Sequence, residues 1–157
     1  MDVFLKEHGA LKLQIELVPD SCWYANVRSN VKQSQWNKIR ATVYQKANYL
    51  CEVCGGKGRR HPVECHEVWE YDETTGIQRL AYFQALCPLC HEVKHFGFAQ
   101  VRGNGDRAFK RFCSVNNIQE YEAGKIIEAI RKQWEIRSRM EWNLDITLLK
   151  EYGIEHT

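Results

Sequence analysis

The sequence has no long apolar run and no marked excess of charge. No stretch of its 157 residues approaches the ~18 consecutive apolar positions of a membrane-spanning helix, and the first ten residues lack the apolar segment of a secretory leader. The formal net charge is only +2, so bulk electrostatics does not identify a nucleic-acid-binding protein, and local clusters of charge would have to do so. We therefore expect a cytoplasmic protein with no membrane partner.

The seven cysteines form a poor disulfide framework, which favours metal binding in a reducing compartment. Four of them make two Cys-x-x-Cys pairs, Cys51 with Cys54 and Cys87 with Cys90. Two such pairs are the usual ligand set of one tetrahedral Zn²⁺, because each pair lies on a tight turn and supplies two thiolates. We predict a structural zinc at these four residues. Four buried thiols without a metal are the alternative.

The periodicity of the chain is that of one α+β domain. Residues 11–17 alternate apolar and polar side chains and predict a half-buried N-terminal strand. Two segments rich in Val, Leu, Tyr and Phe, residues 63–69 and 80–86, predict a β-hairpin. Helical patterns predict helices over about residues 34–47, 88–96, 118–139 and 145–151.

Three parts of the chain differ in what they carry. The cysteine pairs and the hairpin fall within residues 34–100, which we expect to form the core. Residues 1–33 supply the N-terminal strand and an extension, and residues 101–157 supply C-terminal helices that pack on the core. No internal repeat or low-complexity tract interrupts this organisation.

Two histidines follow the second cysteine pair directly. His91 and His95 are four residues apart, so a helix that begins at Pro88 holds them on one face, about 40° apart, with Cys90 about 100° from His91. Such a helix can give its cysteines to one metal ion and aim its histidines at another. The alternatives are a solvent-exposed helix face, or one histidine that replaces a cysteine in the zinc site.

The first strand of the hairpin is expected to supply a third ligand for this second metal. It carries Glu64, Cys65, His66 and Glu67 in consecutive positions. His66 is the best candidate, because neutral imidazole suits Zn²⁺, Ni²⁺ or Cu²⁺ and is tolerated in Mn²⁺ or Mg²⁺ sites. Cys65 is a weaker alternative, since a thiolate would make the site soft and zinc-specific rather than suited to hydrolysis.

These blocks, taken in order, resemble the HNH, or ββα-metal, endonucleases that contain an embedded four-cysteine zinc. The resemblance covers residues 36–96 and rests on Cys51-Glu52-Val53-Cys54-Gly55, Glu64-Cys65-His66-Glu67-Val68, Leu86-Cys87-Pro88-Leu89-Cys90-His91 and Lys94-His95.

The resemblance implies a zinc-stapled ββα-metal core within residues 34–100. It also implies that a catalytic divalent cation (Mg²⁺, Mn²⁺, Ni²⁺ or Zn²⁺) is held by His66, His91 and His95. The activity implied is hydrolysis of phosphodiester bonds in nucleic acid, with DNA as the favoured substrate. His66, Glu67 and His91 would then be the catalytic residues.

The chain departs from the family pattern at two positions. Glu67 occupies the place of the histidine that serves the family as general base, and the central asparagine expected near Tyr82 is missing. With a pKa of ~4.3 against ~6.5 for histidine, a glutamate base would cost roughly tenfold in proton transfer. A regular strand also points His66 and Glu67 to opposite faces, so Glu67 can be the base only if the strand ends or bulges there. Otherwise Glu64 or Glu67 completes the metal shell.

Basic residues near the predicted metals are candidate phosphate contacts. They are Lys57, Arg59 and Arg60, between the first cysteine pair and the hairpin, and Lys94, between the two histidines. Binding through such residues would weaken steeply with added salt. Ordinary solvated charge is an equal alternative, because 20 acidic residues offset 22 basic ones.

Two functions besides an ordinary nuclease remain open. The chain could be a catalytically inactive HNH-like zinc module that binds nucleic acid or a protein partner. It could also be a toxin or phage-defence effector, which would still act as a nuclease.

Overall fold

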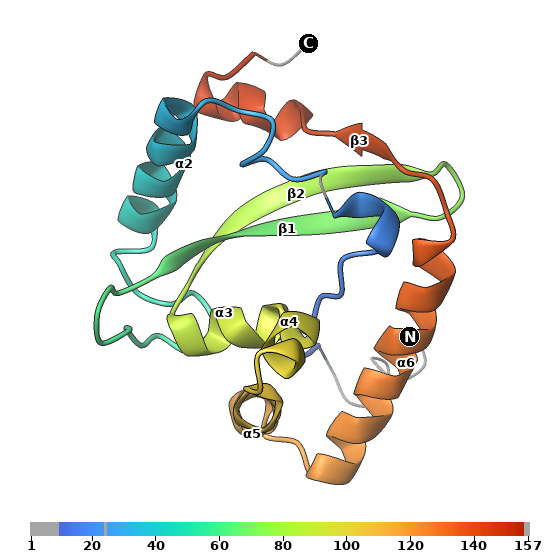
Figure 1. Ribbon diagram of the computed structural model, residues 1–157. Coiled ribbons are helices and arrows are strands. Elements are labelled where there is room, and N and C mark those ends of the chain that lie inside the picture. The colour runs from blue at the N-terminus through green and yellow to red at the C-terminus, as the bar shows by residue number, and fades with distance from the viewer. Residues whose placement is uncertain (1–9, 24, 156–157) are drawn as a thin grey trace.

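The computed structural model describes residues 10–23 and 25–155 and shows an α+β protein, as expected (Figure 1). None of the helices in these two ranges combines the length and apolar character that crossing a bilayer requires. In chain order the elements are η1 (Asp20–Cys22), α2 (Gln33–Lys46), β1 (Glu64–Asp72), β2 (Ile77–Leu86), α3 (Pro88–Lys94), α4 (Phe96–Val101), α5 (Gly105–Asn116), α6 (Glu120–Ser138), β3 (Asn143–Asp145) and η2 (Thr147–Tyr152).

A long antiparallel hairpin of β1 and β2 forms the centre of the molecule (Figure 1). Its turn ends at Gly76, whose φ of +69° is a conformation that glycine adopts without a steric cost. The register pairs His66 with Gln84 and stays regular until a bulge between Val68 and Trp69. The predicted hairpin is therefore confirmed. Both strands extend further toward the turn than the apolar segments indicated.

The hairpin lies between two hydrophobic clusters, because successive side chains of a strand point to opposite faces. Phe83 belongs to the cluster that contains residues of α2 and η2. Leu86 belongs to the cluster that contains residues of α3, α5 and α6. Figure 1 shows α2 and the C-terminal segment on one side of the hairpin and α3, α4 and α5 on the other.

The N-terminal strand predicted for residues 11–17 does not form, and this prediction was wrong. Leu13 and Ile15 are buried as the alternation indicated, at 0% and 5% exposure. The backbone of Leu13, however, pairs with the Asn116 side chain, which accepts from its amide at 3.0 Å and donates to its carbonyl at 2.8 Å. The Glu16 amide donates to the Lys94 carbonyl, so these backbone groups are satisfied without a partner strand.

The predicted helices are found, with differences in bounds and type and with additional elements. The helix that begins at Pro88 ends at Lys94, and a second helix, α4, starts at Phe96 and passes through Gly97, where a stop was expected. The sequence patterns did not indicate α5 or β3, which runs parallel to β2. The long C-terminal helix is confirmed as α6, and the last short helical piece is the 3₁₀-helix η2.

Candidate metal centres

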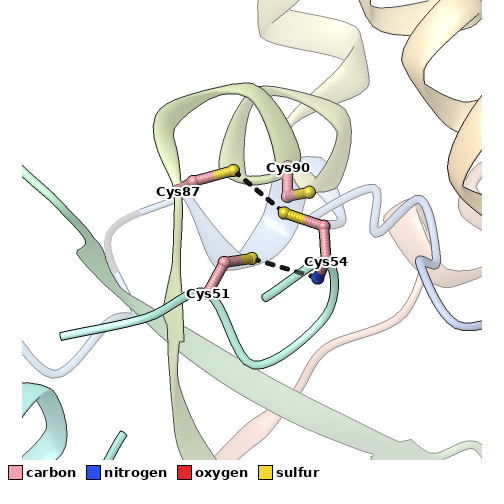
Figure 2. A group of neighbouring side chains, drawn as sticks. All are labelled: Cys51, Cys54, Cys87 and Cys90. Atoms are coloured by element: carbon pink, nitrogen blue, oxygen red, sulfur yellow. Dashed lines mark hydrogen bonds between the residues drawn. The ribbon is translucent and has the colours of Figure 1, made fainter. Parts of the chain in front are cut away.

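The two Cys-x-x-Cys pairs meet in space. The sulfur atoms of Cys51, Cys54, Cys87 and Cys90 all lie within 4.8 Å of one another, and Figure 2 shows them gathered around one point. The Cys54 and Cys87 sulfurs are 3.7 Å apart, against about 3.8 Å for the edge of a tetrahedron with Zn–S bonds of ~2.3 Å. The cluster is therefore compatible with a structural metal such as zinc.

The local backbone explains how the first pair reaches this geometry. Gly55 has a φ of +74°, which closes the turn, and its amide donates to the Cys51 carbonyl at 2.9 Å. The Cys54 amide points at the Cys51 sulfur, at 3.5 Å (Figure 2). The Glu52 amide donates to the Ala85 carbonyl, while the Glu52 carboxylate accepts from the Ala85 amide. The turn is thus fixed to β2, directly before the second cysteine pair.

A positive charge lies beside the second pair. The Arg111 guanidinium on α5 is 3.4 Å from the Cys90 sulfur and 4.0 Å from that of Cys87. Four thiolates around Zn²⁺ carry a net charge of −2, which a nearby guanidinium partly offsets. Sequence motifs alone do not place Arg111 beside the cysteines. Its contact with the cysteines depends on how α5 packs on α3.

The three predicted histidines also come together. His66 lies on β1, His91 on α3, and His95 at the junction of α3 and α4. One ligand nitrogen of each lies within 4.8 Å of the others, and Nε2 of His91 is 3.1 Å from Nε2 of His95. Two imidazole ligands of one tetrahedral zinc would be about 3.3 Å apart. The cluster therefore suits a metal ion as a donor set, separate from the four cysteines.

Carboxylates stand behind two of the imidazoles. Nδ1 of His91 is 3.4 Å from a Glu64 oxygen, and Nε2 of His66 is 2.5 Å from a Glu16 oxygen. A histidine that donates one ring N–H to a carboxylate keeps a lone pair on the other nitrogen, as metal-binding histidines require. Glu64 had been singled out in the sequence. Glu16 had not, because it lies 50 residues before His66 in a segment without any motif.

Burial favours the neutral, metal-binding form of His66 and His95. Desolvation lowers the pKa of His95 to about 3, and the nearby charges of His91 and His66 act in the same direction. Desolvation also lowers the pKa of His66, against the opposing effect of Glu16. The hydrogen bond with His91 lowers the pKa of Glu64, which is therefore an anion at neutral pH. Neutral imidazoles next to an anionic carboxylate suit a divalent cation.

Glu67 lies on the opposite face of the strand from His66. Its carboxylate accepts the amides of Val27 at 3.1 Å and Arg28 at 3.3 Å, and the indole N–H of Trp69 at 3.2 Å. The bulge that could have turned it toward the histidines comes only after Val68. The structure therefore does not bring Glu67 to the histidine cluster, and the geometric condition for its role as general base is not met.

The candidate phosphate contacts fall into two groups. Lys57, Arg59 and Arg60 are exposed, as contacts with nucleic acid require. Lys94 is only 4% exposed, and its ammonium is 3.1 Å from Glu16. The surface position expected for a phosphate contact is thus found for the loop residues and not for Lys94.

The alternative ligand Cys65 is also separated from the histidines. It alternates with His66 along β1 and packs against the cluster on the α2 side. Burial raises the pKa of its thiol to about 12, so the thiolate needed for metal binding is disfavoured.

Comparison of the chain with protein-family models, curated proteins and solved structures gives no match.

Proposed function

We propose that this protein is a metal-dependent endonuclease of the HNH, or ββα-metal, type that hydrolyses phosphodiester bonds in nucleic acid, with DNA as the favoured substrate. The observation that carries the proposal is the sharing of α3 between two donor sets. The helix contributes Cys90 to a four-sulfur cluster and His91 to a three-nitrogen cluster that also includes His66 of β1. A structural site alone needs only the first.

The order of the elements supports the same reading. Two antiparallel strands and a helix follow one another without interruption, and the hairpin and the helix both contribute to the histidine cluster. This is the arrangement that the motifs of residues 36–96 imply for an HNH core. We assign the ion of the four-cysteine cluster as Zn²⁺, which requires reduced thiols and favours a cytoplasmic location.

Each residue of the second centre has a defined part. His66, His91 and His95 would hold the catalytic cation, and Glu64 fixes the tautomer of His91. When bound, a divalent cation supplies a water of lowered pKa and stabilises the departing oxygen. Hydrolysis would then not require the histidine that serves the family as general base at the position of Glu67.

The exposed basic residues Lys57, Arg59 and Arg60 would receive the phosphate backbone near this centre. Their loop is held against the start of α3, because a Cβ atom at Gly58 would lie 2.7 Å from the Pro88 ring. The loop and the histidine cluster are thereby tied to the same helix, as contacts flanking a scissile phosphate require.

One alternative function is favoured by a specific observation. The Glu67 carboxylate accepts hydrogen bonds from the amides of Val27 and Arg28 and from the Trp69 indole. The residue at the position of the family's base therefore has a structural role. This favours a catalytically inactive HNH-like zinc module that binds nucleic acid or a protein partner.

A cleavage assay with a matched control separates the two functions. Zinc-loaded protein is incubated with supercoiled plasmid, and separately with single-stranded RNA, in Mg²⁺, Mn²⁺, Ni²⁺ or Zn²⁺. The enzyme predicts nicking that His91→Ala abolishes, with one zinc per chain retained, and that Glu128→Ala, a change at an exposed position of α6, leaves intact. Binding without cleavage in every metal would instead support the inactive module.

A further inference from the structure

We propose that Glu16 is a positioning residue of the histidine cluster, which fixes the orientation and the tautomer of His66 from outside the ββα segment. The effect on metal binding rests on the function proposed above, whereas the effect on His66 itself does not. The N-terminal segment then supplies a residue to the site, in addition to packing on the core.

Two contacts of its carboxylate and one of its backbone amide hold Glu16 in place. One oxygen is 2.5 Å from Nε2 of His66, and the other is 3.1 Å from the ammonium of Lys94. The Glu16 amide also donates to the Lys94 carbonyl at 3.0 Å. A carboxylate held at both oxygens and through its own backbone has little freedom to rotate, so the imidazole that it contacts is oriented as well.

The burial of these groups makes their pairing selective. His66 and Lys94 are 3% and 4% exposed, while Glu16 is 27% exposed. A buried ammonium is costly unless an anion compensates it, and Glu16 is the anion to which Lys94 donates. Lys94 in turn offsets the charge of Glu16. The Glu16–Lys94 pair therefore places a hydrogen-bond acceptor beside the buried His66 imidazole without adding a net charge.

The backbone around Glu16 is anchored independently of the histidines. Leu13 and Ile15 are buried in the cluster that contains Val93 of α3, and Asn116 of α5 clamps the backbone of Leu13. The position of Glu16 beside His66 is therefore set by the packing of the residues that precede it and not by the histidines. This is what a positioning residue requires, because its place must not depend on the group that it orients.

The tautomer follows from the contact. A neutral His66 that donates its Nε2–H to Glu16 keeps its lone pair on Nδ1, the nitrogen then left for a cation. His91 is held in the opposite way, because its Nδ1 faces Glu64 and its Nε2 faces His95. Two carboxylates from different parts of the chain thus impose opposite tautomers on neighbouring ligands.

Nuclear magnetic resonance of the ring nitrogens tests the proposal on the zinc-loaded chain of 157 residues without a second metal. Long-range ¹H–¹⁵N spectra should show His66 with its proton on Nε2. The double variant Glu16→Ala/Lys94→Met, which avoids leaving a buried ammonium unpaired, should give a mixture of tautomers. The control Glu70→Ala removes an exposed carboxylate from β1 and should leave the His66 signals unchanged.

Co²⁺ titration of the same proteins gives the metal readout. We expect the double variant to bind Co²⁺ at the histidine cluster roughly 10- to 100-fold more weakly, the range typical for loss of such a partner, with the zinc content unchanged. A His66 proton on Nδ1 in the wild type, or an unchanged tautomer in the double variant, overturns the proposal. A wild type that binds no Co²⁺ and cleaves nothing refutes the proposed nuclease, while the tautomer measurement still decides the role of Glu16.

Discussion

The substitution Glu67→Gln distinguishes the role that the family motif implies from the role that the structure shows. In the structure, one carboxylate oxygen of Glu67 accepts the amides of Val27 and Arg28, and the other accepts the Trp69 indole N–H. Glutamine can keep the first oxygen as an acceptor, but its NH₂ group then faces the indole donor. One of three hydrogen bonds is therefore lost.

The expected cost is modest for glutamine and larger for alanine. Loss of the bond from Trp69 should lower the free energy of unfolding by about 1 kcal/mol, and Glu67→Ala, which removes all three acceptors, by on the order of 3 kcal/mol. Cleavage by the folded Gln variant should stay within about threefold of wild type. A lost general base would instead lower the rate roughly 100-fold or more.

Urea unfolding and plasmid cleavage, measured on the same samples, provide the assay. The dependence on pH gives a second signature. Burial raises the pKa of Glu67 above its unfolded value, so protonation favours the folded state. The stability of the wild type relative to Glu67→Gln should therefore fall as the pH rises through the interval from the unfolded to the folded pKa. A large loss of cleavage at unchanged stability would refute the anchoring role and restore Glu67 as the base.

Three further changes test the metal centres and the basic loop. Removal of zinc by a strong chelator under reducing conditions should unfold the protein, since a structural zinc contributes on the order of 10 kcal/mol, and an unchanged circular dichroism spectrum would contradict this. Arg111→Leu should speed the transfer of zinc to a colorimetric chelator, whereas Arg107→Leu, which breaks only the surface pair with Glu92, should not. Gly58→Ala should destabilise by about 1–3 kcal/mol, because its Cβ would lie 2.2 Å from the His61 carbonyl oxygen. Its control, Gly124→Ala in α6, meets open space and should be neutral or stabilising.

The sequence allowed each cysteine pair, and the pair of His91 and His95, to be predicted as ligands that act together, because their spacings are local. Two residues between paired cysteines and three between His91 and His95 determine which side chains one turn or one helix can present together. The hairpin was equally accessible, since its apolar strands flank a polar turn. The meeting of the two cysteine pairs, 33 residues apart, and of His66 with His91 and His95 was inferred from the order of the motifs and from their resemblance to the HNH family.

The features that were missed depend on partners far away in the sequence. Residues 11–17 have the alternation of a strand, but the backbone of Leu13 is satisfied by Asn116 of α5 and the amide of Glu16 by the Lys94 carbonyl, both far away in the sequence. Nothing near Glu16 indicates His66 or Lys94. Glu67 lies on the face opposite His66 because the strand is regular at this position and bulges only between Val68 and Trp69. A periodic pattern reports burial but not the identity of the partner.

The two centres are coupled through the helix that they share. Cys87 caps α3, Cys90 lies in its first turn and His91 follows directly, so a metal ion that fixes the sulfurs also fixes the axis along which His91 points. The opposite wall of the histidine cluster is set by β1, which is tied to the first cysteine pair through β2 and the Glu52–Ala85 contacts. Strand and helix therefore both take their relative position from the cysteine cluster. A metal ion at the cysteine cluster would therefore also hold the strand and the helix that present His66 and His91 to each other.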